Sequence, residues 1–332
     1  MKTLGWLDVQ STDAARNLAL EQYVFDALPR DRDYLLLWRN ENAVIIGKHQ
    51  NTAAEINAAA VEEQGVQVVR RLSGGGAVYH DLGNLNFTFI TDAPADGDLD
   101  FGRFCRPVVA LLQRLGVEAE LSGRNDMTIA GQKFSGNAQY MRQGRVMHHG
   151  TILFDSDLEA VARVLQSHPE KFQGKATRSV RSRVTNVRPH LREDMELAAF
   201  RAALLSSLLA DVPHEKVVLT EADEAAIDAL RRERYATWEW NYGYSPACTA
   251  VKAARIPGCG SVEAHLDIEE GIIQKITFTG DFFSPHGVER LAEHLRGVRL
   301  EHGALTEVLA DFDVKSCIAG LRVEALTELL CH

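Results

Sequence analysis

The sequence predicts an α+β protein in which a mixed β-sheet domain is followed by a small C-terminal α/β domain. The chain has 332 residues, which corresponds to about two domains of 150 residues. Its helical and strand-like segments do not alternate as regular βαβ units, and this favours an antiparallel or mixed sheet. An aromatic cluster at 238–244 precedes a separate strand pair. The predicted domains are therefore 1–245 and 246–332.

The first 154 residues alternate predicted helices with short strands. Ser11 is the expected N-cap of a first helix, whose apolar face includes Leu18 and Phe25 and which ends at Pro29. The other expected helices, each followed by a glycine, are 53–64 and 101–115. The expected strands are 34–38, 43–46, 66–70, 86–90 and several short runs between 127 and 154.

The C-terminal part has the pattern of one hairpin and two helices. Residues 262–268 alternate apolar and polar side chains, Glu270-Gly271 forms the turn, and 272–279 form the returning strand. Helices are expected at about 286–296 and 314–330. A unit of about 80 residues lies near the lower limit for independent stability.

The charge balance restricts the partners that the protein can have. The chain carries 36 Lys and Arg against 46 Asp and Glu, a net charge of −10, which argues against nucleic acid and anionic membranes as partners. Residues 121–190 differ from the rest, with 11 basic and 5 acidic residues. This basic segment indicates a local anionic ligand.

The cysteines and the N-terminus predict a cytoplasmic protein. Five cysteines without a C-x-x-C pair suit a reducing compartment. The first residues lack the apolar core of a signal peptide, and no run approaches the roughly 18 apolar residues of a membrane span.

A glycine-rich motif at 70–84, RRLSGGGAVYHDLGN, is the first candidate for chemistry. Three successive glycines let the backbone adopt positive φ and direct N–H groups at an anion. Arg70 and Arg71 can neutralise a phosphate or carboxylate. A flexible turn beside two solvated arginines is the alternative. The motif is neither a P-loop nor G-x-G-x-x-G, since Tyr79 occupies the third glycine position.

A second motif, GRNDMTIAGQKFSGNA at 123–138, contains a single lysine. Lys133 is the only lysine between 66 and 170, a span with nine arginines. A compact ammonium group can sit between two anionic oxygens, although a surface lysine would give the same pattern. Asp126 has three possible roles: binding Mg²⁺, binding an adenine amine, or capping the turn.

Two further segments are more ambiguous. His148 and His149 are neighbours on a predicted strand, so they point to opposite faces and cannot share a metal. One is expected to be buried and hydrogen-bonded and the other exposed. The basic run at 175–186, which includes Arg181, suits a loop that orders over phosphates as well as a plain exposed loop. No zinc spacing or nucleophile elbow is present.

In this order, the motifs resemble those of the lipoate–protein ligases over essentially the whole chain. The resemblance rests on 70–84, on 123–138 with Lys133, on HHGT at 148–151, on SVRSRVTN at 179–186, and on WEWNYG at 238–243. It implies a catalytic domain of the biotin/lipoyl ligase type with a small accessory domain. It also implies a reaction in which lipoate and ATP form lipoyl-AMP and pyrophosphate, and a carrier lysine then receives the lipoyl group. The implied carriers are the E2 subunits of 2-oxoacid dehydrogenases and the H protein of the glycine cleavage system.

The resemblance also assigns residues to the ligands. Lys133 corresponds to the family lysine that touches both lipoate and the α-phosphate and is the catalytic candidate. Arg71 and the backbone of Gly76, Ala77, Val78 and Tyr79 correspond to the nucleotide-contacting segment. The lipoate candidates are Lys133, Arg71, Ser73, Gly74, Gly75 and His149, and Asn84, Asp126 and Arg181 are weaker candidates. Mg²⁺ is expected with ATP, and Val78 and Tyr79 are possible walls of an apolar channel.

Three functions other than a ligase can be compared with the sequence. A transferase of the same fold would carry the acyl group on a cysteine thioester, but 106–247 has no cysteine and Cys105 lies in a helical pattern. A non-catalytic lipoylation scaffold is the second rival. A sensor that binds DNA would need a basic DNA-binding module, which the sequence does not indicate.

Overall fold

The computed structural model describes residues 2–94, 100–123, 125–165, 184–245, 248–280, 282, 284 and 287–331. The chain divides into two compact units. Unit 1 consists of Met1–Lys48, Gln67–Ala162 and His168–Ala236. Unit 2 consists of His49–Val66, Arg163–Ser167 and Thr237–His332. The predicted boundary at 245/246 stays a prediction, and the compact units follow a different division in which two internal segments join the C-terminal part.

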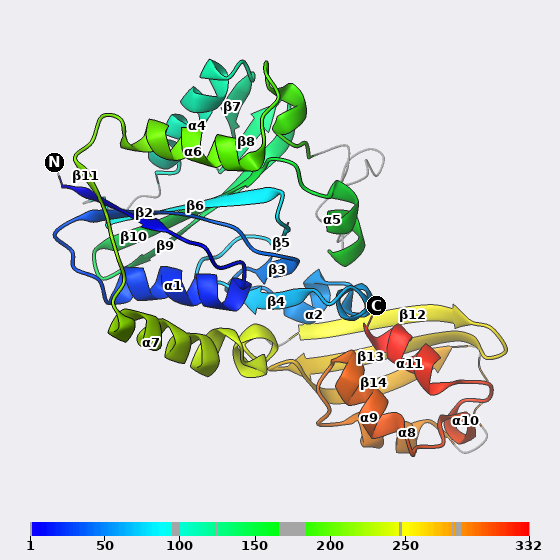
Figure 1. The fold of residues 1–332 in the computed structure, drawn as a ribbon. Helices are drawn as coiled ribbons and strands as arrows, with labels where there is room; N and C mark the ends of the chain where they lie inside the picture. The colour runs from blue at the N-terminus through cyan, green and yellow to red at the C-terminus, as the bar shows by residue number, and fades with distance from the viewer. Residues whose placement is uncertain are drawn as a thin grey trace. The chain divides into compact units, whose positions relative to one another are not determined.

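Among the described residues, unit 1 contains an eight-stranded mixed sheet in the order β11-β1-β2-β6-β10-β9-β8-β7 (Figure 1). β1 pairs in parallel with β2 and β11, and the other neighbours are antiparallel. The strands are β1 Leu4–Asp8, β2 Asp33–Trp38, β6 Asn84–Asp92, β7 Ala119–Ser122, β8 Asp126–Ile129, β9 Gln132–Arg142, β10 Arg145–Leu153 and β11 His214–Lys216. The predicted α+β class with a mixed sheet is confirmed.

Helices cover this sheet from both sides. α4 and α6 pack over a core that includes Phe87, Phe134 and Phe200, whereas α1 lies on the opposite side (Figure 1). The central strands β6 and β10 are buried on both faces, and the polar side chains that they carry are therefore buried as well. The helices are α1 Ala14–Asp26, α4 Gly102–Arg114, α5 Leu158–Val164, α6 Leu197–Leu209 and α7 Glu221–Leu230, followed by η3 Arg188–His190 and η4 Arg231–Tyr235.

Two predicted helices begin or break differently in the structure. The N-cap of α1 is Asp13, whose carboxylate accepts the amide of Arg16 at 3.1 Å, and Ser11 instead accepts the amide of Asp13. The predicted helix 53–64 consists of α2 Thr52–Glu55 and α3 Ala58–Glu63. Asn57 separates them because its side chain caps the second helix.

A small mixed sheet in unit 1 positions the glycine-rich turn. Its order is β4-β3-β5, with β4 Gln67–Arg70, β3 Ala43–Ile46 and β5 Val78–His80. β3 pairs in parallel with β4 and antiparallel with β5. The connection between the two outer strands therefore crosses one end of this sheet and carries residues 71–77.

Unit 2 is built on an antiparallel sheet in the order β12-β13-β14, with β12 Cys248–Ile256, β13 Gly260–Glu269 and β14 Ile272–Gly280. The predicted hairpin is β13–β14, and β12 is an additional strand. Side chains of β13 alternate between buried and exposed, so one face of the sheet packs on the helices. The helices are η5 Glu239–Gly243, α8 Glu289–Leu295, α9 His302–Leu309, α10 Val314–Cys317 and α11 Val323–Cys331.

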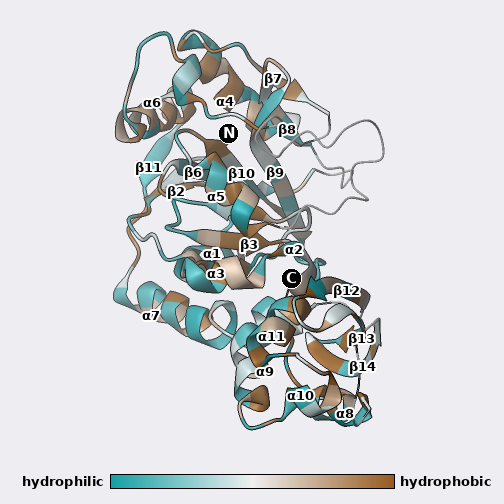
Figure 2. Cartoon of the chain, turned by 90° about the vertical axis from the view of Figure 1, so that its right-hand side faces the viewer, coloured by the Kyte–Doolittle hydropathy of each residue, from teal (hydrophilic) through white to brown (hydrophobic). Residues whose placement is uncertain are grey.

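The predicted helix 314–330 is divided in two. Gly320, between α10 and α11, has a φ of +82°, which a helix interior does not accept. Polar and apolar residues lie side by side along α7 and α11 (Figure 2), as expected for helices with one buried face.

Candidate functional site

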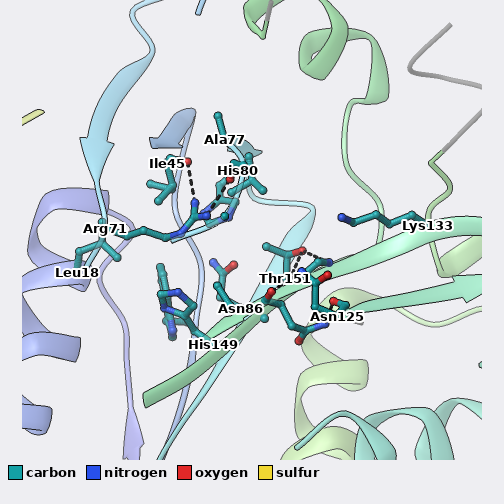
Figure 3. Close-up of a pocket in the computed structure, with 18 residues that line it drawn as sticks. Leu18, Ile45, Arg71, Ala77, His80, Asn86, Asn125, Lys133, His149 and Thr151 are labelled. Atoms are coloured by element: carbon teal, nitrogen blue, oxygen red, sulfur yellow. Dashed lines mark hydrogen bonds between the residues drawn. The ribbon is translucent and has the colours of Figure 1, made fainter. Parts of the chain in front are cut away.

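A cavity of about 120 Å³ lies in unit 1, where the glycine-rich turn meets strands β9 and β10. Strands from both sheets of the unit and helix α1 supply its walls (Figure 3). We call it the site cavity, and its lining residues are Leu18, Trp38, Ile45, Arg71, Gly75, Gly76, Ala77, Val78, His80, Asn86, Asn125, Lys133, Gly136, Asn137, Ala138, His149, Gly150 and Thr151.

The glycine-rich turn is wrapped around the Arg71 guanidinium group. Nη2 donates to the carbonyl oxygens of Gly74 and Gly76, both at 2.8 Å, and Nη1 donates to Ile45 at 3.1 Å. Gly75 has a φ of +96°, the left-handed region that glycine adopts without strain. Burial lowers the pKa of Arg71 to about 10, so the group keeps its charge at neutral pH. Arg71 therefore fixes the shape of this turn.

A buried hydrogen-bond chain connects Arg71 to a carboxylate. Arg71 Nε donates to Ser73 Oγ at 3.0 Å, and Ser73 Oγ lies 2.6 Å from His149 Nε2. His149 Nδ1 faces the Glu21 carboxylate at 3.2 Å, and Thr88 Oγ donates to the same carboxylate. Glu21 is 1% exposed, so this chain sets the buried side of the cavity wall.

Lys133 extends from β9 into the site cavity (Figure 3). Its Nζ lies 2.8 Å from Asp126 Oδ1, and the two side chains are 39% and 36% exposed. Its carbonyl oxygen accepts the amide of Thr185 at 2.9 Å, so the described end of the basic run at 175–186 lies beside it. Gly136 lies against the ammonium group, since a Cβ there would be 2.9 Å from Lys133 Nζ.

Two asparagines lock the wall next to Lys133. Asn137 N and Nδ2 both donate to the carbonyl oxygen of Asn125 at 3.0 Å, and Asn125 Nδ2 donates to the carbonyl oxygen of Asn137 at 2.8 Å. Thr151 Oγ accepts the amide of Gly136 at 3.1 Å. These contacts hold the β9 segment in which Lys133 lies.

The structure brings most of the predicted site residues to one cavity. Its walls include Arg71, Gly75, Gly76, Ala77, Val78, Lys133 and His149. Ser73 and Gly74 lie behind the wall as partners of Arg71, and Asp126 lies beside Lys133. Arg181 lies outside the described residues, as does most of the basic run at 175–186.

Two predicted residues point away from the cavity. The Tyr79 hydroxyl donates to Asn42 Oδ1 at 3.1 Å, because Tyr79 alternates with Val78 and His80 along β5. Val78 is therefore a cavity wall and the Tyr79 side chain is not. Asn84 is fully buried and donates to Asn86 at 2.9 Å.

The expectation that one of the two adjacent histidines is exposed was wrong. His148 is 0% exposed and His149 is 8% exposed, because β10 is covered on both faces. His148 packs between aromatic rings, with Phe104 at 4.6 Å between centroids. Burial lowers its pKa to about 3. As expected from their opposite directions, only His149 lines the site cavity.

Several site residues were not predicted from the sequence, although two left a signal. Glu21 lies on the same helical face as Leu18 and Phe25, so a carboxylate on an apolar face was the indication. His80 shares a strand face with Val78. The other lining residues that were not predicted to belong to the site are Leu18, Trp38, Ile45, Asn86, Asn125, Gly136, Asn137, Ala138, Gly150 and Thr151.

The four cysteines with described side chains, Cys105, Cys259, Cys317 and Cys331, are buried, and none of them lines the site cavity. Burial raises the pKa of the Cys105 and Cys331 thiols to about 12 in each case, so both remain protonated at neutral pH. The thiolate is the nucleophilic form of cysteine. These two thiols are therefore unsuited to carrying an acyl group.

The described residues contain no helix long and apolar enough to cross a membrane. They also contain no cluster of three or more His, Cys, Asp or Glu side chains arranged to hold a metal ion. Mg²⁺ needs only one or two carboxylates when substrate phosphates supply the other ligands. Asp126, beside Lys133, has the oxygen donors that such a shared ion requires.

Comparisons with known proteins agree over both parts of the chain. Residues 13–209 match the lipoyl protein ligase A/B catalytic domain, and residues 245–330 match the bacterial lipoate protein ligase C-terminus. Lipoate-protein ligase LplJ of Bacillus subtilis is 42% identical over 98% of this chain and 99% of its own. Lipoate–protein ligase 1 of Staphylococcus aureus is 38% identical over 91% of this chain and 92% of its own.

Solved structures of similar fold cover the larger part of the chain. A bipartite lipoate protein ligase studied with its E2 lipoyl domain, from Thermoplasma acidophilum, has a TM-score of 0.64 at 30% identity, covering 74% of this chain and 98% of its own. A putative lipoate protein ligase of the same organism, with bound lipoic acid, has a TM-score of 0.62 at 26% identity, covering 73% of this chain and 100% of its own. Lipoate-protein ligase A bound with ATP has a TM-score of 0.62 at 28% identity, covering 74% of this chain and 100% of its own. This chain therefore belongs to the lipoate–protein ligase family of enzymes.

Proposed function

We propose that the protein activates free lipoate with ATP, forming lipoyl-AMP and pyrophosphate, and then transfers the lipoyl group to a lysine of a carrier domain. The observation that carries this proposal is the site cavity, which combines the Lys133 ammonium group, a glycine-rich backbone turn and apolar walls. Similar proteins bind lipoic acid and ATP, and one was studied with an E2 lipoyl domain. The expected carriers are E2 subunits of 2-oxoacid dehydrogenases and the glycine cleavage H protein.

The first step joins two anions, so the site must offset their repulsion. An oxygen of the lipoate carboxylate forms a bond to the α-phosphorus of ATP, and the bond to pyrophosphate breaks with its electron pair. Lys133 is the catalytic group in this proposal, because its ammonium can lie between carboxylate and phosphate oxygens. Holding both reactants in one cavity removes most of the entropic cost of bringing them together.

The remaining contacts divide between nucleotide and acyl chain. Backbone N–H groups of Gly76, Ala77, Val78 and Tyr79 bind ATP, and Arg71 supports them by fixing the turn. Ser73, Gly74, Gly75 and His149 shape the lipoate side, and the apolar tail is held by Leu18, Trp38, Ile45 and Val78, all of which line the cavity. Mg²⁺ would be shared between ATP phosphates and Asp126, where it would offset phosphate charge. Asn84 and Arg181 are weaker candidates for contacts with the ligands.

The cysteine environment supports a ligase over a transferase of the same fold. Cys105 Sγ lies 3.9 Å from His148 Nε2, but burial depresses the histidine pKa to about 3, so this imidazole is not a strong base. Burial also raises the pKa of the thiol. Both effects oppose thiolate formation, which a thioester mechanism requires.

The test is lipoate-dependent exchange of pyrophosphate into ATP by the purified protein. The exchange should be well above a lipoate-free control, and absence of exchange would refute the ligase proposal.

Lys133→Ala should abolish exchange while the unfolding midpoint stays unchanged. A variant in which all five cysteines are replaced should keep its turnover. A folded but inactive cysteine-free variant would revive the transferase, and inactivity of the wild type with retained carrier binding would favour a scaffold.

A further inference from the structure

The site cavity has two buried N–H groups that no described part of the chain satisfies. His80 is 3% exposed, Asn86 is 1% exposed, and both line the cavity. Among the described residues, His80 Nε2 and Asn86 Nδ2 have no hydrogen-bond partner. An unpaired buried polar group costs about 1–3 kcal/mol. Two such groups at the wall of one cavity indicate a bound group that completes them.

The hydrogen bonds behind His80 determine which of its nitrogens carries the proton. Asn17 Nδ2 lies 2.9 Å from the carbonyl oxygens of Ser11 and Arg39, so it is the donor side of that amide. It also donates to Asn40 Oδ1 at 3.0 Å. Asn40 must therefore present its own Nδ2 to His80 Nδ1, which lies 3.1 Å away and accepts. A neutral His80 consequently carries its proton on Nε2, the unpaired nitrogen.

Both groups are neutral donors rather than cations. Burial, reinforced by the charges of Arg71 and His149, lowers the pKa of His80 to about 3, so the ring is neutral near pH 7. Asn84 Nδ2 donates to Asn86 Oδ1 at 2.9 Å, and in this arrangement Asn86 Nδ2 has no partner among the described residues. The cavity thus has two neutral donors in addition to Lys133.

We propose that His80 and Asn86 donate hydrogen bonds to the acyl oxygen of lipoyl-AMP and stabilise the negative charge it gains during transfer; this inference rests on the proposed function. The Lys133 ammonium group and the turn amides suit oxygens that are already charged before transfer, those of the lipoate carboxylate and of the phosphates. The acyl oxygen is neutral in lipoyl-AMP and becomes negative as the lysine attacks. Donors that gain strength only then lower the barrier rather than merely tightening substrate binding.

In the transfer step, the lone pair of the lysine ε-nitrogen forms the new C–N bond, and the carbonyl π pair moves onto the acyl oxygen. The carbonyl then reforms as the C–O bond to the phosphate breaks, and AMP leaves with that electron pair. The proton released by the nitrogen passes to water. His80 and Asn86 retain their protons and act as hydrogen-bond donors only. A neutral imidazole with a strongly lowered pKa can polarise a carbonyl in this way.

The experiment separates transfer from activation by supplying chemically prepared lipoyl-AMP to the full-length enzyme with a lipoyl carrier domain. His80→Phe and Asn86→Leu remove one donor each and should lower the single-turnover transfer rate by about 10²–10³-fold. Affinity for lipoyl-AMP should fall by much less. His80→Gln restores an N–H group and should recover part of the rate. Asn86→Asp places an oxygen where the donor was and should be the slowest variant.

A matched control is Tyr34→Phe, which removes a partly buried hydrogen bond of the same unit, from the hydroxyl to the Pro29 carbonyl, outside the cavity. It should transfer at the wild-type rate. Transfer by the donor-free variants within about threefold of wild type would overturn the proposal, as would equal losses in rate and affinity.

An NMR measurement of the ring nitrogens tests the same proposal without a substitution. In the free wild-type enzyme, His80 should carry its proton on Nε2, and a proton on Nδ1 would overturn the assignment. Pyrophosphate exchange by the wild type is measured in parallel. If exchange fails, the proposed activation is wrong, whereas transfer from supplied lipoyl-AMP still tests the two donors.

Discussion

Replacing Glu21 by alanine tests the buried chain that links Arg71 to a carboxylate. The Glu21 side chain is 2% exposed, and it accepts hydrogen bonds from Thr88 and faces His149 Nδ1 at 3.2 Å. It also supplies negative charge near the buried Arg71 guanidinium. Removal leaves two buried donors without an acceptor and a buried cation without its counter-charge.

The size of the effect follows from these contacts. Each of the two buried donors left unpaired costs about 1–3 kcal/mol, so together they cost about 2–6 kcal/mol. We therefore expect Glu21→Ala to lower the free energy of unfolding by about 3–5 kcal/mol. Glu21→Gln keeps the volume and one acceptor oxygen, so it should lose less than the alanine variant.

The assay is equilibrium urea unfolding, with the midpoint shifted and the slope unchanged. Asp26→Ala is the control on the same helix, because it breaks a partly exposed ion pair with Arg142 and should cost at most about 1 kcal/mol. A Glu21→Ala protein within about 1 kcal/mol of wild type would show that the chain does not couple Arg71 to the carboxylate.

Three other substitutions or conditions have expected outcomes. Gly136→Ala puts a Cβ 2.9 Å from Lys133 Nζ, so pyrophosphate exchange should fall at least tenfold while the unfolding midpoint stays near wild type; full activity would argue against the position assigned to the ammonium group. Gly83→Ala puts a Cβ 2.0 Å from a backbone carbonyl oxygen, so soluble yield or stability should fall sharply, and an unchanged thermal midpoint would contradict this packing. Because burial lowers the pKa of His80 and His148 to about 3, the unfolded chain binds more protons between about pH 6.5 and 3. Stability should therefore fall with decreasing pH by about 1.4 kcal/mol per unit for each histidine, and a flat urea midpoint across this window would refute it.

The fold class and the catalytic motifs were predictable because they depend on local signals. Strand and helix patterns gave the mixed sheet, and the glycine-rich motif with Lys133 led to the right family. Helix ends were less predictable, since the competition between Ser11 and Asp13 for the N-cap depends on the direction in which the chain approaches α1. The break at Gly320 was also missed, because the apolar pattern of 314–330 indicated one continuous helix.

The buried polar part of the site could not be derived from periodicity. Exposure of the second histidine was expected from strand alternation, but the sheet is covered on both faces, so alternation does not predict solvent there. His80 lies on β5 of the small sheet and Asn86 on β6 of the large sheet, and both line the site cavity only because the two sheets meet there. The role of His80 depends on the orientation of the Asn40 amide, and that of Asn86 on the orientation of the Asn84 amide. The sequence pattern does not indicate these orientations.

The division into units has a consequence for folding during synthesis. Segment 49–66 belongs to unit 2, yet the C-terminal part of that unit begins at residue 237. At about 5–20 residues per second, the ribosome needs roughly 10–30 s to synthesise the chain between them. During that interval Ile56, which is 1% exposed in the finished protein, has no completed unit 2 to bury it. Unit 2 can therefore form its full core only at the end of translation.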